Sequence, residues 1–402
     1  MVSKRAQKVL GDPPPIVKAH IICAKDSYDA KTNPDGYINL GVAENFLMDA
    51  EITIKIAELS KKPFYHHYNY PQGSPELRSA YLGFLDFFFK IKNIPPENIV
   101  FASGASAILE MLTYALCDEG DEILVPSPLY NGFYHDVELR FGAKIITSDC
   151  ITISGFNLKI FESSIKENKN LKAVLINHPH NPTGQTLNET EIRSIIEICK
   201  KYELDIIADE IYANSVYGEA DFISFLDPRF DDLNYLNNIH HVFGLAKDFG
   251  MSGLKTGIFA SHNINLSKAM AAVSYFYTVS TQTQSLAQGL FEDIHWCEKF
   301  FKVNRQRLKE VSTYVYEYFK KAGAEVFPGT SGIFLWVDLS HLSSIKTFED
   351  ESRFFEQLMT QEKINLTPGK PFGSNKPGTF RVCFAKPIDL IKVAFKRFDK
   401  IK

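Results

Sequence analysis

The sequence predicts an α/β fold in which a mainly parallel sheet lies between helices, followed by a smaller α+β region. Between residues 50 and 287, short strand-like runs alternate with segments of helical periodicity, and the runs lie at 98–102, 122–125, 144–147, 172–176, 204–208 and 240–243. Most residues in these runs are apolar, without a regular alternation with polar ones, as in strands that helices cover on both faces. The chain has 402 residues, 45% of them hydrophobic, which is enough for one large lobe and a second smaller one.

The two ends of the chain differ from this central region. The first forty residues are rich in turn formers, as in Asp12-Pro-Pro-Pro and Asn33-Pro-Asp-Gly, and we expect an extended arm with little regular structure. A long helical stretch from Gln284 to Lys321 leads into short strand-like runs at 324–327, 332–338 and 379–384. We therefore expect an arm and part of the small lobe over residues 1–49, the large domain over 50–287 and a small C-terminal domain over 288–402.

Composition argues against several classes of function. A net charge of −4 without a block of Lys or Arg gives no electrostatic footprint for nucleic acid. No run approaches the roughly 18 apolar residues that cross a bilayer, and the N-terminus lacks the apolar core of a secretory signal. The six cysteines are scattered and the histidines show no metal-binding spacing. We expect a cytoplasmic protein with reduced cysteines, no metal and no membrane or nucleic-acid partner.

Ligands of an open α/β sheet bind beyond the carboxyl ends of its strands. After the first run, the small residues Gly104, Ala105 and Ser106 open a helix, where backbone N–H groups and the helix dipole favour a phosphate. Glycine-containing turns without a phosphate are at least as common. Asn181, held by Pro182 after another run, could donate its amide to a cofactor oxygen, although Asn-Pro also favours an ordinary turn.

Two charged residues follow later runs. Asp209 ends the run at 204–208, with Tyr212 three residues on, and a carboxylate at the end of a buried strand requires a cationic partner. An isolated Asp at such a position is more often a helix cap. Lys247 follows the run at 240–243, and its amine becomes nucleophilic where its pKa is lowered, whereas most lysines are solvated surface residues.

The ordered set of phosphate turn, Asn-Pro, strand-end Asp with Tyr, and Lys resembles the fold-type I enzymes that use pyridoxal 5′-phosphate (PLP), the aminotransferase class I/II family. Asn181 and Asp209 are 28 positions apart, and Asp209 and Lys247 are 38 apart. The resemblance implies a seven-stranded type of sheet and a PLP cofactor bound as a Schiff base to Lys247, which would also shuttle the proton from Cα. Asp209 would keep the pyridine nitrogen protonated, while Asn181 and Tyr212 would bond the phenolic oxygen.

The same resemblance assigns further residues. Tyr130 matches the aromatic residue that stacks on the cofactor ring, and Arg381 matches the arginine that grips the substrate α-carboxylate. Gly104, Ala105, Ser106 and Lys255 fall in the phosphate site. Tyr68 matches the tyrosine that reaches the phosphate in the neighbouring subunit, which implies a homodimer with shared active sites.

Three segments are similar to one branch of this family, the 1-aminocyclopropane-1-carboxylate (ACC) synthases and their relatives. They are the run from Asn33 to Leu47, Gly332-Ile-Phe-Leu-Trp-Val-Asp and Pro377-Gly-Thr-Phe-Arg-Val-Cys-Phe. Glu44 then matches a glutamate that recognises the substrate. Its ordinary structural interpretation is an acid in the first turn of a helix that begins near Ala43.

The reaction stays open at this point. ACC synthases expel a Cγ group from S-adenosylmethionine, whereas aminotransferases convert the amino acid to a 2-oxo acid, and both need the same Lys, Asp and Arg. A non-catalytic PLP-fold binding protein is the remote alternative. The phosphate site also departs from the family pattern, because Lys255 stands where arginine is usual and Gly244 where serine is usual. The losses of a forked guanidinium and of a hydroxyl donor predict weaker cofactor retention.

Overall fold

The computed structural model describes residues 2–7, 9–62, 66–342 and 344–401. Their contacts divide the chain into two units. The large unit comprises Glu44–Glu310 and Pro328–Ile333, and the small unit comprises Met1–Ala43, Val311–Phe327 and Phe334–Lys402. Helix α11 (Ile294–Lys321) contributes to both of them.

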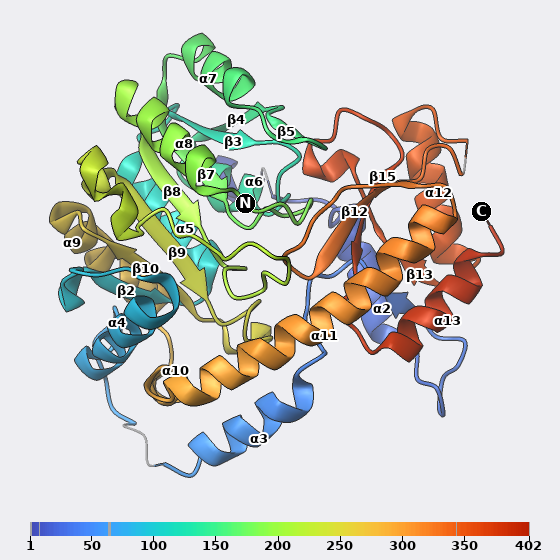
Figure 1. Ribbon diagram of the computed structural model, residues 1–402, viewed down its shortest axis with the longest axis horizontal. Helices are drawn as coiled ribbons and strands as arrows, with labels where there is room; N and C mark the ends of the chain where they lie inside the picture. Colours follow the sequence, from blue (N-terminus) through green and yellow to red (C-terminus); the bar gives the residue numbers. More distant parts are fainter. Residues whose placement is uncertain (1, 8, 63–65, 343, 402) are drawn as a thin grey trace. The chain divides into compact units, whose positions relative to one another are not determined.

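The large unit contains a seven-stranded sheet in the order β2-β10-β9-β8-β7-β3-β4 (Figure 1). Its strands are β2 (Ile99–Ala102), β3 (Glu122–Pro126), β4 (Lys144–Ser148), β7 (Leu171–Asn177), β8 (Asp205–Asp209), β9 (Ile239–Gly244) and β10 (Gly257–Ser261). All neighbouring pairs are parallel except those of β10, which runs antiparallel to both β2 and β9. This arrangement confirms the predicted α/β class with a mainly parallel sheet. The six predicted runs all form strands of this sheet, and its remaining strand, β10, was not predicted.

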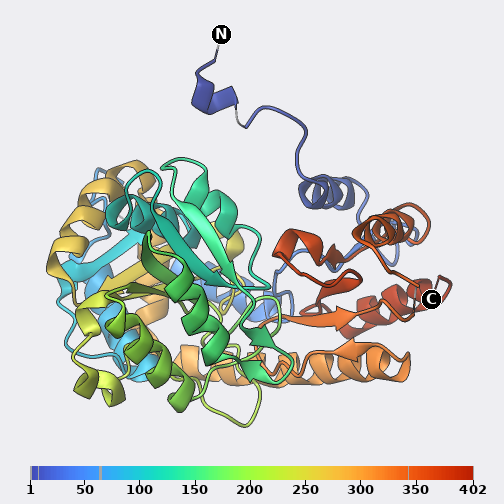
Figure 2. The ribbon, with the colours of Figure 1, turned by 90° about the horizontal axis from the view of Figure 1, so that it is seen from above.

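Helices cover both faces of this sheet, as Figures 1 and 2 show. Alternate strand residues enter two separate cores, so that Ile206 and Ala208 belong to one and Ile207 to the other. The first core includes α3 (Asp49–Leu59), α4 (Pro75–Phe89), α7 (Leu158–Glu167), α8 (Glu189–Lys201) and α10 (Thr281–Glu292). The second includes α5 (Ala105–Leu116), α6 (Phe133–Glu138) and α9 (Ile264–Val273). Burial on both faces explains why the central strands are mostly apolar.

The small unit is built on an antiparallel sheet in the order β11-β12-β15-β14. These strands are β11 (Glu325–Val326), β12 (Phe334–Asp338), β14 (Thr367–Pro368) and β15 (Thr379–Cys383). Two short parallel strands, β1 (Ile38–Asn39) and β13 (Ile364–Asn365), pair with each other. Its helices include α1 (Lys4–Gln7), α2 (Pro15–Lys25), α12 (Phe348–Thr360) and α13 (Ile388–Phe398). The mixture agrees with the predicted α+β lobe.

One local expectation was wrong. The N-terminal arm contains the 11-residue helix α2, because Pro15 at its first position is compatible with a helix start and Ala19 and Cys23, four residues apart, pack beside Met359. The stretch from Gln284 to Lys321 is helical as predicted, but it consists of two helices, since α10 ends at Glu292 and α11 begins at Ile294.

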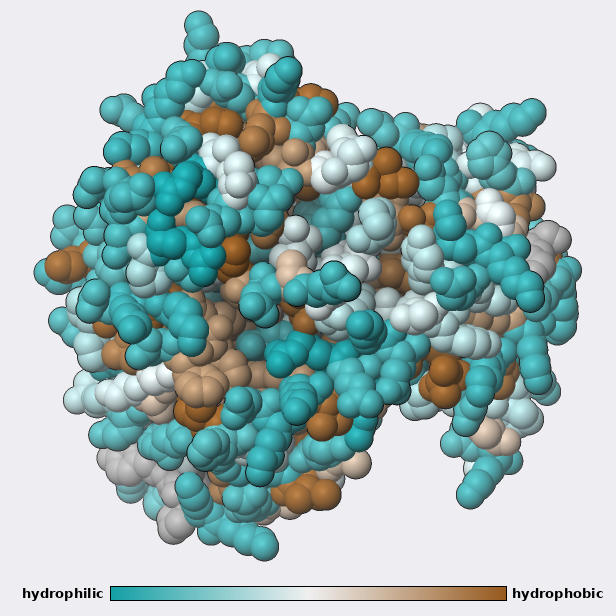
Figure 3. Space-filling view, viewed as in Figure 1, coloured by the Kyte–Doolittle hydropathy of each residue, from teal (hydrophilic) through white to brown (hydrophobic). Residues whose placement is uncertain are grey.

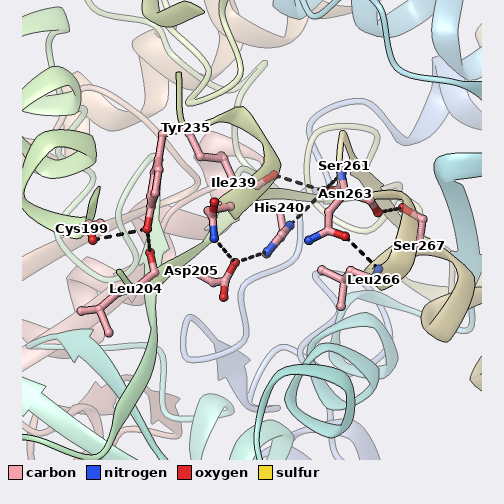
Figure 4. Close-up of polar contacts among 11 residues, drawn as sticks. Cys199, Leu204, Asp205, Tyr235, Ile239, His240, Ser261, Asn263, Leu266 and Ser267 are labelled. Atoms are coloured by element: carbon pink, nitrogen blue, oxygen red, sulfur yellow. Dashed lines mark hydrogen bonds and ion pairs between the residues drawn. The ribbon is translucent and has the colours of Figure 1, made fainter. Parts of the chain in front are cut away.

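The buried side chain of His240 connects three strands at the end of the sheet where β10 ends (Figure 4). The Nε2 atom of His240 lies 3.0 Å from Oδ1 of Asp205, and its Nδ1 lies 3.0 Å from Oγ of Ser261. His240 thus links β8, β9 and β10. Among the described residues no group of three or more His, Cys, Asp or Glu could hold a metal ion. All six cysteines are free and buried.

The surface drawn in Figure 3 is mostly hydrophilic, with apolar residues in small separate groups. No described helix combines the length and the apolar character that a membrane crossing requires.

Candidate active site

A cavity of roughly 190 Å³ in the large unit brings together most of the predicted site residues. It lies at the carboxyl ends of β2, β7 and β8, beside the turn that follows β9. This is the edge of the sheet at which ligands of open α/β sheets bind. The predicted residues that line it are Gly104, Ala105, Ser106, Tyr130, Asn181, Asp209, Tyr212, Lys247 and Lys255.

The turn between β2 and α5 forms one wall of the cavity. Gly104 has φ +107°, a conformation that glycine adopts without strain, and Ala105 begins the helix. A Cβ atom on Gly257 of β10 would lie 2.3 Å from the carbonyl carbon of Gly104, so the two backbones touch at this point. The helix start directed at the cavity can therefore accept an anion through its backbone N–H groups.

Asp209 is the last residue of β8 and only 5% of its surface is exposed. Burial raises the pKa of its carboxyl group to about 7, helped by the nearby Asp136 and Glu210 and opposed by a backbone hydrogen bond from Ile211 and by the charge of Lys247. Its Oδ2 atom accepts a hydrogen bond from Asn177, whereas its Oδ1 atom is buried and has no hydrogen-bond partner among the described residues. A buried acceptor of this kind fits a cationic N–H donor such as a protonated pyridine ring.

Lys247 lies in the turn that follows β9. The next residue, Asp248, is fully buried and accepts hydrogen bonds from the backbone N–H of Asn214 (2.7 Å) and the hydroxyl of Ser215 (2.6 Å). Burial raises the pKa of Asp248 to about 7. These contacts join the loop that carries Lys247 to the segment that follows Tyr212, so both side chains are held in one cavity wall.

The remaining walls are aromatic and amide groups. Tyr212 and Asn181 are almost completely buried, at 2% and 3% exposure. Tyr130 packs edge-on against Phe133, with the ring centroids 5.2 Å apart and the planes at 88°. A flat aromatic ligand would thus meet one aromatic face and two polar side chains in the same space.

Asn177 and Asp136 are polar cavity residues that the sequence analysis did not select. Asn177 ends β7 and so obeys the same strand-end rule that selected Asp209. Asp136 lies in α6, where no sequence signal marks it. Burial raises its pKa to about 7, and a hydrogen bond with Ser106 opposes that shift.

Three predicted residues do not line this cavity. Arg381 lies on β15 of the small unit, where its Nη2 donates to the carbonyl of Gly41 (2.8 Å) and its guanidinium carbon lies 4.8 Å from the centroid of the Phe372 ring. Tyr68 is fully exposed.

The third is Glu44, whose Oε1 accepts a hydrogen bond from the cavity residue Ser252 (2.7 Å). Its interpretation as part of a helix that begins near Ala43 was wrong. The nearest helix, α3, begins at Asp49, and the loop before it carries Glu44 to Ser252 instead.

The chain is similar to known proteins over nearly its whole length. The family model of aminotransferase class I and II matches residues 35–398. The chain is 31% identical to 1-aminocyclopropane-1-carboxylate synthase 8 of Arabidopsis thaliana, over 94% of this chain and 85% of that one. An aspartate aminotransferase double mutant of Thermus thermophilus superposes with a TM-score of 0.83 at 21% identity, covering 100% of both chains. Aspartate aminotransferase of Thermotoga maritima gives a TM-score of 0.79 at 26% identity, covering 99% of both.

Proposed function

The chain belongs to the aminotransferase class I and II family, whose members use PLP, and we propose from its site that it is an ACC synthase-like enzyme that acts on an L-α-amino acid with a Cγ leaving group. One observation carries the cofactor assignment. A buried strand-end carboxylate, Asp209, has an oxygen with no hydrogen-bond partner among the described residues, and it lines the cavity that also holds Lys247. Bound PLP supplies an electron sink that stabilises negative charge at the substrate Cα.

The residues of the cavity divide the work of holding this cofactor. Lys247 anchors it covalently and moves the proton at Cα. Asp209 keeps the ring nitrogen protonated, and Asn181 and Tyr212 donate to the phenolic oxygen. Tyr130 stacks on the ring. Gly104, Ala105 and Ser106, with Lys255, hold the phosphate at the start of α5.

The substrate is recognised through its α-carboxylate, which all α-amino acids share, and through its side chain. Arg381 binds the α-carboxylate with a guanidinium fork. Glu44 accepts a hydrogen bond from Ser252, a residue of the cavity wall, and contributes to recognition of the substrate side chain. Similarity to an ACC synthase over 94% of the chain supports loss of a Cγ group from an S-adenosylmethionine-type substrate.

The alternative reaction is transamination, in which the amino acid leaves as a 2-oxo acid. The likeness to Thermotoga maritima aspartate aminotransferase at 26% identity supports it. Both reactions start with removal of the same Cα proton, so the residues described above serve either.

We also propose that the enzyme works as a cytoplasmic homodimer. The fully exposed side chain of Tyr68 would reach the phosphate in the partner subunit. Large aromatic residues that are also exposed in the large unit, Tyr70, Tyr275 and Phe276, would be covered by the same contact.

Product analysis tests the reaction. Purified enzyme is incubated separately with S-adenosylmethionine and with a panel of amino acids, and the products are identified by mass spectrometry. Methylthioadenosine together with ACC supports the proposal, whereas a 2-oxo acid with pyridoxamine phosphate supports the aminotransferase. Lys247→Ala should lose both the products and the visible absorbance of the bound cofactor, while the exposed Lys268→Ala should keep them. Absence of that absorbance in the unaltered enzyme would instead indicate a non-catalytic binding protein.

A further inference from the structure

Asn177 and Asp209 end neighbouring parallel strands in register. They are Cα partners of β7 and β8, so their side chains leave the same face of the sheet at adjacent positions. Both line the cavity, and Asn177 is 7% exposed. Its amide is therefore placed beside the carboxylate that we assign to the ring nitrogen of the cofactor.

Both ends of the Asn177 amide are engaged. Nδ2 donates to Asp209 Oδ2 and to the Asp209 carbonyl, each at 3.1 Å, and Oδ1 accepts from the backbone N–H of Asn181 at 2.6 Å. A carboxylate only accepts and a backbone N–H only donates, so the amide has one possible orientation. One side chain thus fixes Asp209 on one side and Asn181 on the other.

We propose that Asn177 is a positioning residue that holds the Asp209 carboxylate through Oδ2, reserves Oδ1 for the ring nitrogen of PLP, and couples this contact to Asn181 at the phenolic oxygen. The inference rests on the proposed function. Without the Asn177 amide, Oδ2 of Asp209 would lose its hydrogen-bond donor and the carboxylate could rotate. A buried carboxylate with fewer donors carries its charge less readily and stabilises a protonated ring less.

Asn177→Ala removes both contacts, and Asn98→Ala is the matched control. Asn98 is also a buried Asn of the large unit, donating to the carbonyl of Ser261 at 3.0 Å, but it is not among the residues that line the cavity. Three quantities are measured for each: the urea midpoint of unfolding, the PLP dissociation constant, and the ¹⁵N chemical shift of labelled PLP against pH, which reports protonation of the ring nitrogen.

Both variants should lose stability, but only Asn177→Ala should raise the PLP dissociation constant, by about tenfold if one hydrogen bond to a charged group is lost. Only this variant should release the ring proton at a lower pH than the unaltered protein. If its dissociation constant and its ¹⁵N titration match those of Asn98→Ala, Asn177 has a structural role alone and the inference is wrong.

Asn177→Leu keeps roughly the size of the side chain and covers the case in which the alanine variant does not fold. It lacks both the donor to Asp209 and the acceptor for Asn181, and it adds no charge beside the ring. We expect the same changes in the PLP dissociation constant and in the ¹⁵N titration as in Asn177→Ala, and values equal to those of Asn98→Ala would contradict the inference. Failure of the unaltered protein to bind PLP overturns the proposed function itself, which separates the two outcomes.

Discussion

Oε2 of Glu210 lies 2.8 Å from Nδ1 of His241, and neither side chain has exposed surface. The other ring nitrogen of His241 lies 3.0 Å from the hydroxyl of Tyr81, and Glu210 also accepts hydrogen bonds from Ser224 Oγ and the backbone N–H of Phe225. Glu210 follows Asp209 directly in the chain. Because successive residues leave opposite faces of an extended segment, this network anchors the end of β8 from the face opposite to Asp209.

Removal of Glu210 should therefore destabilise the protein strongly. Glu210→Ala leaves the buried donors of Ser224, Phe225 and His241 without their acceptor, and a loss of about 3–5 kcal/mol is typical for a broken buried pair. Urea unfolding measures the change. The exposed Glu197→Ala on α8 should stay within about 0.5 kcal/mol of the unaltered protein, and equal losses for the two variants would contradict the assigned role.

Asp209 should make the cofactor-free protein less stable as the pH rises. Burial raises its pKa in the folded state to about 7, and its unfolded value is about 4. Between these values the folded chain binds more protons than the unfolded chain, so the free energy of unfolding falls by roughly 1.4 kcal/mol per pH unit from about pH 4 to 7. Asp136 and Asp248, with pKa values of about 7, act in the same direction.

Asp209→Asn removes the free-energy cost of ionising a buried carboxyl group. At pH 8 the cofactor-free variant should therefore be more stable than the unaltered protein, while it binds PLP more weakly. Denaturant unfolding between pH 5 and 8 measures the slope. The exposed Asp221→Asn should leave the slope unchanged. A variant of Asp209 that is less stable at pH 8 and keeps its affinity for PLP would refute the assignment.

Strand positions were predictable because burial on both faces leaves an apolar run in the sequence. The missed strand β10 (Gly257–Ser261) is buried throughout, but it begins with Gly and ends with Ser. Helix α2 was missed because its cue, Pro15 at the first position, also belongs to a Pro-rich turn. In both cases the local signal is shared by two structures, and only tertiary packing selects between them.

The site was predictable where chemistry restricts the residue type. A lysine, a strand-end acid and an Asn-Pro at set spacings led to Lys247, Asp209 and Asn181, and all three line one cavity. Asn177 directly follows a predicted strand, but its residue type alone does not mark it, and Asp136 has no signal in the sequence. Their roles arise from neighbours that the fold supplies, Asp209 for one and Ser106 for the other.

Arg381 should control substrate affinity more than stability. Arg381→Lys keeps a positive charge but loses the planar fork that can bind both carboxylate oxygens. Loss of one charged hydrogen bond is worth about 1.5–3 kcal/mol, so we expect KM to rise by roughly ten- to hundredfold. KM is measured by steady-state kinetics with the substrate that the product analysis identifies. Arg353→Lys, an exposed arginine of the same unit, is the control, and an equal KM in both variants would remove Arg381 from the substrate site.

Lys255→Arg should tighten cofactor binding by about tenfold, if the guanidinium gains one further charged hydrogen bond to the phosphate. Lys255 lines the cavity, so an arginine side chain at this position would extend into the proposed phosphate site. Equilibrium dialysis of the cofactor-free protein against PLP gives the dissociation constant, and Lys268→Arg controls for added surface guanidinium. An unchanged or larger dissociation constant would show that the lysine does not weaken cofactor retention.

Gly244→Ser should not restore a phosphate ligand, although serine is usual at this position in the family. Gly244 pairs with Gly257 across β9 and β10, and a Cβ atom on Gly244 would lie 2.6 Å from the carbonyl oxygen of Thr256. That oxygen belongs to the backbone and already accepts a hydrogen bond from Leu245, so a shift would disturb the turn that carries Lys247. We expect a lower urea midpoint and a larger PLP dissociation constant than in the unaltered protein. A serine variant that is equally stable and binds PLP more tightly would mean that the two strands can separate at this point, and that the missing hydroxyl weakens cofactor retention.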